Sequence, residues 1–179
     1  MIKDLDITKA QAGMIKSAFA LTYLLFAPLM GWLTDRIGGR KVISLFCLFL
    51  GGGTFLMGKA DSLTDSAFFY SIVGIGAAAT WVPIVTLVQT WFGEKKMGLA
   101  LGILSPSYGL GYGLMGLLLP LIVASYGWRR CWLLLGISGL VLVFINGFFL
   151  RSHPEDIGLR PWGEVSESMT VPQKKAFWI

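Results

Sequence analysis

The stretch GWLTDRIGGRK, residues 31–41, is the part of the sequence that indicates the fold most directly. It is a short turn, rich in glycine and charge, between two long apolar runs. Turns of this kind join two membrane-spanning helices on the side of the membrane where positive charge accumulates. The stretch therefore predicts a membrane-length helix on either side of it.

The composition of the 179-residue chain also indicates a membrane protein. Hydrophobic residues make up 55% and charged residues 14%, against about 25% charged residues in an average soluble domain. A soluble domain of this size could not bury so much apolar surface, whereas lipid solvates it in a membrane. The net charge is +5, but the basic residues lie in short loops between apolar runs. We interpret them as topology signals rather than as a nucleic-acid surface.

Five apolar segments approach or exceed the roughly 20 residues that a helix needs to span a bilayer. Thr8, followed by Gln11, predicts a capping box at the start of the first helix. The predicted fold class is therefore an all-α membrane protein with a polar linker at its end. The expected helices cover residues 10–34, 41–58, 66–92, 97–125 and 129–150; residues 1–9 precede them and 151–179 form the linker.

The distribution of lysine and arginine predicts the orientation. The turn at 31–41, the turn at Lys95 and Lys96 and the linker carry more of these residues than the opposite loops. Because cytoplasmic loops carry this excess, we expect the two turns and the linker in the cytoplasm and residues 1–9 outside. Arg129 and Arg130 weaken the bias, and we interpret them as side chains that reach the headgroups. The expected location is the plasma (inner) membrane.

The turn at 31–41 resembles the signature loop of the major facilitator superfamily of secondary transporters, G-x-x-x-D-[RK]-x-G-x-[RK]-[RK]. The stretches at 91–102 and 127–129 resemble two further joins of that family. The stretch at 154–161, PEDIGLRP, resembles a sequence common in its monocarboxylate and oxalate/formate-like branches. The matching positions of the signature loop, our predicted gating loop, are Gly31, Asp35, Arg36, Gly38, Arg40 and Lys41.

The resemblance implies twelve helices in two similar halves that transport by alternating access. This chain would supply helices two to six and the central linker, so we expect a fragment that lacks the first helix and the second half. The resemblance also implies that Asp35 meets a helix of the missing half and helps to hold the cytoplasmic side closed. The alternative is a solvated charged turn.

Polar and amphipathic side chains at membrane depth need a hydrogen-bond partner or a wet cavity. A substrate pathway would supply the cavity, and packing between helices would supply the partner. Lys16, near the outer end of the first helix, could attract an organic anion or extend its amine to the headgroups. The candidates for the pathway are Lys16, Tyr23, Trp81, Gln89, Tyr108, Tyr112 and Asn146.

Several glycines lie near one face of the fourth helix. Small residues let helix backbones approach closely in lipid. They would serve either packing inside this half or a seam against the missing half. These glycines are Gly102, Gly109, Gly113 and Gly116.

The predicted function is transmembrane transport of a small organic solute, most simply an organic anion such as a monocarboxylate, coupled to a proton or another ion. The alternatives are a non-transporting membrane fragment or helper subunit, or a transporter of sugars or drugs. Residues 70–89 lack the charge that the fourth helix of drug exporters carries, which disfavours the drug class. The sequence suggests no enzyme, cofactor or metal, because Cys47 and Cys131 lie in apolar segments and His153 has no apparent metal partners.

Overall fold

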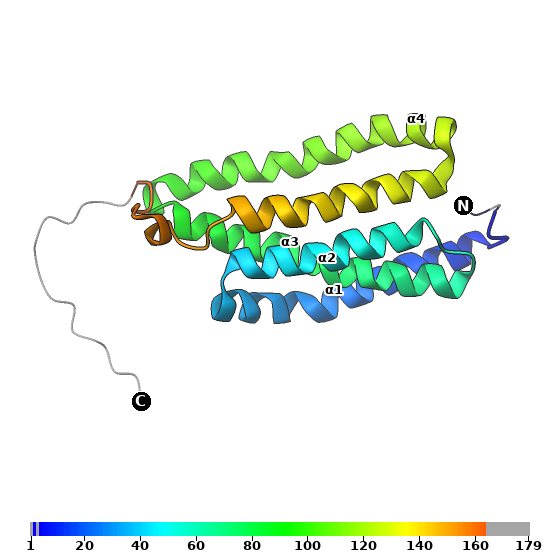
Figure 1. Ribbon diagram of the computed structural model, residues 1–179, viewed down its shortest axis with the longest axis horizontal. Coiled ribbons are helices and arrows are strands. Elements are labelled where there is room, and N and C mark those ends of the chain that lie inside the picture. Colours follow the sequence, from blue (N-terminus) through cyan, green and yellow to red (C-terminus); the bar gives the residue numbers. More distant parts are fainter. Residues whose placement is uncertain (1, 3, 164–179) are drawn as a thin grey trace, which may run out of the picture.

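A computed structural model describes residues 2 and 4–163 as a bundle of long helices (Figure 1). The later part of the predicted linker, residues 164–179, lies outside the described residues. Each of the four long helices is long and apolar enough to cross a membrane, which confirms the all-α membrane fold. The elements are α1 (Lys9–Ile37), α2 (Gly39–Met57), α3 (Leu63–Trp91), α4 (Glu94–Phe149) and the short 3-10 helix η1 (Pro154–Ile157).

Helix α4 contains two of the predicted helices, because it reverses direction at Gly127. The backbone there has φ 79° and ψ 162°, a conformation that glycine adopts without the strain of a side chain. Figure 1 shows α4 folding back on itself. We call residues 94–126 the first arm and residues 128–149 the second arm. The predicted helix boundaries agree with the observed ones to within about one helical turn.

The first helix begins as the sequence predicts. The Gln11 backbone amide donates to the Thr8 hydroxyl at 3.2 Å, and the Thr8 backbone amide donates to the Gln11 side-chain oxygen at 2.8 Å. These reciprocal bonds form a capping box and satisfy amides that have no partner inside the helix.

The bundle has a small core at the centre of the first three helices. Met30 of α1, Val42 and Phe46 of α2, and Ala78 and Ala79 of α3 form its buried cluster. Much of the remaining apolar surface is exposed. Leu24 and Phe144, for example, lie inside long helices with 72% and 77% of their surfaces accessible. Such a surface is stable when lipid rather than water covers it.

Helix α2 lies between α3 and the second arm of α4, and glycines set the separation from the second arm. A Cβ atom placed on Gly136 would lie 2.4 Å from the backbone nitrogen and Cα of Phe55. A Cβ atom on Gly51 would lie 2.7 Å from the backbone nitrogen of Leu140. No side chain fits at either position without moving a helix, so these glycines are required by packing. The sequence analysis did not select them.

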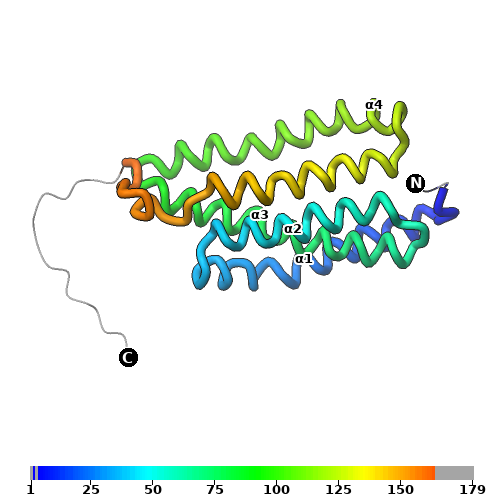
Figure 2. The backbone as a smooth tube through the Cα atoms, in the orientation of Figure 1, coloured from blue at the N-terminus to red at the C-terminus, as the bar shows by residue number. Residues whose placement is uncertain are grey.

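The first arm stands apart from this packing. Figure 2 shows it along one edge of the bundle, and most of its residues are exposed. Within the described residues, a Cβ atom on any of the four glycines selected from the sequence would meet no atom within 4 Å. Close packing inside this part of the chain therefore does not explain them, and the seam against another half stays a prediction. The four are Gly102, Gly109, Gly113 and Gly116.

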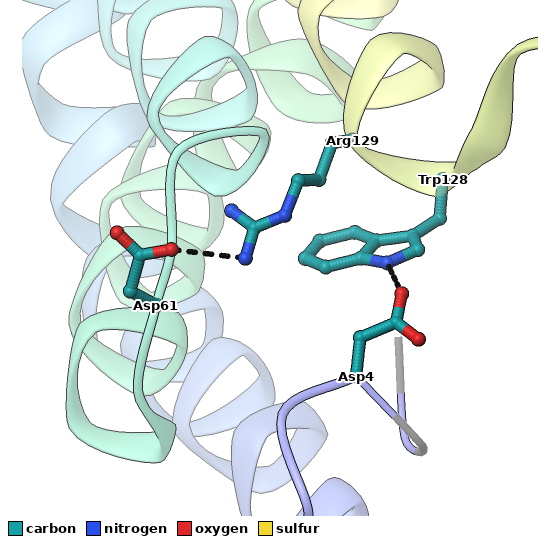
Figure 3. A network of polar contacts seen from close by, with 4 residues as sticks. All are labelled: Asp4, Asp61, Trp128 and Arg129. Carbon is teal, nitrogen blue, oxygen red and sulfur yellow. Dashed lines mark hydrogen bonds and ion pairs between the residues drawn. The ribbon is translucent and has the colours of Figure 1, made fainter.

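Polar side chains tie the reversal of α4 to the neighbouring loops (Figure 3). The Trp128 indole donates to the Asp4 carboxylate at 2.5 Å, and Arg129 forms an ion pair with Asp61 at 2.9 Å. The Arg129 guanidinium also lies 4.7 Å from the centre of the Trp128 ring. Arg129 therefore has a protein partner, which the sequence-based assignment to headgroups did not anticipate. These contacts join the N-terminal segment, the α2–α3 turn and the start of the second arm.

The glycine contacts generate a direct prediction. Replacing Gly136 with leucine should destabilise the fold by about 1–3 kcal/mol or more, because overpacking forces α2 and the second arm apart. Gly113→Leu is the matched control, since its site is open in the described structure. The measurement is the yield of monodisperse protein after detergent extraction. Equal yields for the two variants would contradict the close approach of α2 and the second arm.

Candidate functional site

The predicted gating loop is shorter than the sequence suggested. Helix α1 continues to Ile37 and α2 begins at Gly39, so Gly38 alone separates them. Gly38 has φ +87°, a conformation that favours glycine. Asp35 thus lies in the last helical turn of α1, and its side chain is exposed. The negative charge there faces the unfavourable end of the helix dipole.

Two basic residues of the loop, Arg36 and Arg40, contact an aromatic ring and a backbone oxygen. The Arg36 guanidinium lies 4.4 Å from the centre of the Trp32 ring. Arg40 donates from Nε and Nη2 to the backbone oxygen of Gly147, at 3.2 and 2.5 Å. Arg40 therefore fastens the start of α2 to the end of the second arm, a role that its position in the signature loop does not reveal.

A cavity of about 850 Å³ opens beside the gating loop. Residues 34–41 form one wall, and Thr86 and Thr90 of α3 form another. Ser152, His153 and Asp156, which follow α4, complete the lining. The sequence analysis missed the two threonines, although their spacing of four residues places them on one face of a helix. The cavity brings together two stretches that resemble family motifs, the gating loop and residues 154–161.

A second group of candidates meets between α3 and the first arm of α4. Trp81 of α3 and Tyr108 of the first arm form an edge-to-face pair with ring centres 5.2 Å apart. The Tyr108 hydroxyl lies 3.5 Å from the Thr80 hydroxyl. Trp81 and Tyr108 are 38% and 42% exposed although both lie well inside long helices. Tyr112 follows one turn later on the first arm and is 78% exposed.

The other predicted pathway residues lie elsewhere. Tyr23 packs against the core cluster, and the Asn146 amide donates to Cys47 Sγ at 3.4 Å, as interhelical packing would require. Gln89 is exposed near the end of α3. Lys16 is exposed beside a cavity of about 160 Å³ that Tyr70 and Trp132 also line. The structure therefore brings Trp81 and Tyr108 into contact and does not gather all seven candidates.

Comparison with known proteins identifies the family. The sequence profile of the Major Facilitator Superfamily matches residues 1–178. This chain belongs to that superfamily. The superfamily comprises membrane transporters, so the predicted transporter family is confirmed, and the chain is part of a multi-pass membrane protein.

Curated relatives are named as transporters rather than as enzymes. The "probable sulfoacetate transporter SauU" of Cupriavidus necator is 29% identical over 86% of this chain and 36% of its own length. The "probable galactarate/D-glucarate transporter GarP" of Escherichia coli is 30% identical over 78% of this chain and 33% of its length. The human "glucose-6-phosphate exchanger SLC37A2" is 28% identical over 95% of this chain and 35% of its length. The chain thus spans about a third of the length of these relatives.

The Arg40 contact can be tested by substitution. Arg40→Ala should lower the unfolding midpoint in detergent, because a hydrogen bond from a charged group contributes about 1.5–3 kcal/mol when it is sheltered and less when it is partly exposed. Lys41→Ala is the control, since Lys41 is the exposed neighbour in the same cationic loop. The measurement is the thermal midpoint of each variant. A fall no larger than that of the control would show that Arg40 does not join α2 to the second arm.

Proposed function

We propose that this chain forms part of a secondary transporter that moves a small organic anion across the plasma (inner) membrane by alternating access. The observation that carries the proposal is the exposed Trp81–Tyr108 pair at membrane depth. The pair lies between α3 and the first arm, and both side chains are partly exposed.

The chemistry of this pair suits an organic anion. The Tyr108 hydroxyl and the Trp81 indole N–H can donate hydrogen bonds to an oxyanion. The ring faces offer apolar surface to the carbon skeleton of the same solute. Amphipathic groups exposed at this depth need a partner, and a solute pathway between two halves of a transporter supplies one.

The names of the relatives support a class of substrate for this chain. The sulfoacetate, galactarate or glucarate, and glucose 6-phosphate in their names all carry carboxylate, sulfonate or phosphate groups. We therefore propose an organic anion with one of these groups, which is broader than the monocarboxylate predicted from the sequence. Within this class, a sugar phosphate is the specific candidate that the human exchanger supports. A proton or another ion would couple the transport.

We further propose that Asp35 acts in the gate on the cytoplasmic side. Its side chain is exposed beside the large cavity, where another half of the transporter could contact it. The turn at Lys95 lies at the same end of the bundle as the gating loop. The Trp91 indole, just before this turn, donates to the backbone oxygen of Arg151 at 3.0 Å, and the next residue, Ser152, lines the cavity beside the gating loop. The excess of positive charge at this end supports a cytoplasmic orientation.

The aromatic pair provides the test of the transport function. In the complete transporter that contains this chain, Tyr108→Phe should weaken anion binding by about tenfold, the effect of losing a hydrogen bond worth roughly 1.4 kcal/mol. Trp81→Ala should reduce uptake further because it removes the apolar face. Phe144→Leu is the control, on the lipid-exposed side of the second arm. The measurement is saturable uptake of sulfonates, dicarboxylates and sugar phosphates into proteoliposomes. Unchanged uptake of every anion by both variants would exclude the pair from the pathway.

The gate is tested separately. Asp35→Asn should lower the transport rate more than it lowers the yield of folded protein. The charge would change the free-energy difference between the inward- and outward-facing states by about 1–3 kcal/mol. Asp65→Asn, at the start of α3 near the other end of the bundle, is the control. The measurements are the transport rate and the amount of monodisperse protein. Normal transport by Asp35→Asn would leave Asp35 as a solvated turn residue.

A further inference from the structure

We propose that residues 150–163 form a strap, a structured segment that fastens the α3–α4 turn to the end of the second arm and couples that turn to the gating loop. From the sequence, residues 151–163 are expected to be part of a polar linker. The structure instead gives it contacts with two separate junctions of the bundle, the α3–α4 turn and the gating loop between α1 and α2.

The end of the strap pairs with the α3–α4 turn. The Trp162 amide donates to the Trp91 oxygen at 2.9 Å, and the Gly93 amide donates to the Trp162 oxygen at 3.0 Å. These two bonds form a parallel bridge between Trp162 and Phe92. The rings of Phe92 and Trp162 meet edge to face with centres 5.7 Å apart. Backbone and side chain therefore hold the same two segments together.

The first turn of α4 adds to this anchor. The Lys96 ammonium lies 5.2 Å from the centre of the Trp162 ring, a cation–π contact. Gly163 has φ +87°, and a Cβ atom on it would lie 2.4 Å from Lys96 Cγ. A side chain at this position would therefore have to displace Lys96 and adopt a strained backbone conformation.

The middle of the strap is ordered by local bonds. Helix η1 fills this part, and the His153 amide donates to the Asp156 carboxylate at 3.2 Å in its capping box. Pro154 is fully buried. The Leu159 amide donates to the Pro154 oxygen at 3.0 Å and closes the turn after Gly158. This segment has a defined conformation of its own rather than that of a free linker.

The beginning of the strap reaches the gating loop. The Arg151 oxygen accepts the hydrogen bond from the Trp91 indole. Ser152, His153 and Asp156 line the cavity beside residues 34–41. A Cβ atom on Gly38 would lie 2.8 Å from the Ser152 hydroxyl, so the strap touches the single residue between α1 and α2. A displacement of the α3–α4 turn relative to this hinge must therefore bend the strap or release it.

Hydrogen–deuterium exchange of the detergent-solubilised chain tests the strap. In Trp162→Ala, the peptide that covers residues 91–97 should exchange about tenfold faster, because hydrogen bonds and an aromatic pair of roughly 1 kcal/mol each are weakened. Exchange of residues 34–44 should also rise if the strap couples the two regions. Unchanged exchange at 91–97, with the helices intact by circular dichroism, would overturn the proposal.

A matched pair of glycine variants makes the test independent of Trp162. Gly163→Ala and Gly158→Ala introduce the same methyl group at a residue with positive φ, but only the former would meet Lys96, since the site of Gly158 is open. Gly163→Ala should therefore loosen residues 91–97 more than Gly158→Ala does. Equal effects would contradict the anchor, and faster exchange at 91–97 without any change at 34–44 would contradict the coupling.

The importance of the coupling for transport rests on the proposed function, but the strap itself does not. The exchange measurement uses no substrate and no transport assay. Failure of the anion-transport proposal would therefore leave its result unchanged, and failure of the strap would leave the Trp81–Tyr108 test unchanged.

Discussion

The position of α2 between α3 and the second arm depends on direct contact between helix backbones. In lipid, apolar side chains gain little by leaving the solvent, so association depends on close packing. Gly51 and Gly136 permit this packing where α2 crosses the second arm, and Gly76 permits it on the other side, where a Cβ atom would lie 2.3 Å from the backbone nitrogen of Leu50. This arrangement places the end of the second arm beside the start of α2. The bond from Arg40 to Gly147 and the path of the strap both follow from it.

The first arm is not held by close contacts between helix backbones. A Cβ atom on its glycines would meet no neighbouring atom in the described part of the chain, and Tyr108 supplies a contact with Trp81 of α3. A loosely held arm with aromatic and hydroxyl groups exposed at membrane depth is suited to line a pathway rather than a core. The contrast between the two arms of α4 therefore separates a packed scaffold from a surface available to a solute or to another half of the transporter.

Polar contacts lie at both ends of the bundle, where helices meet water and headgroups. At one end Trp128 and Arg129 bind Asp4 and Asp61 across three segments (Figure 3). At the other end Arg40 and the strap join the gating loop, the α3–α4 turn and the end of α4. At the second end the bonds use backbone groups that lack partners inside a helix, whereas at the first end they join side chains. A transporter that alternates between two states must keep or exchange such contacts, and the strap is the part of this chain placed to transmit a movement between two turns.

The sequence by itself determined the local features of this protein. Helix positions followed from the lengths of apolar runs, the start of α1 followed from Thr8 and Gln11, and the family followed from residues 31–41. These signals depend on neighbours within a few positions along the chain. The tertiary structure decided which groups meet: Gly136 rather than Gly113 lies at a helix contact, Arg40 binds a carbonyl 107 positions away, and Trp162 pairs with the α3–α4 turn. The physical reason is that glycine on an apolar helix looks the same in sequence whether it faces lipid or another backbone, and only the packing of distant helices distinguishes the two.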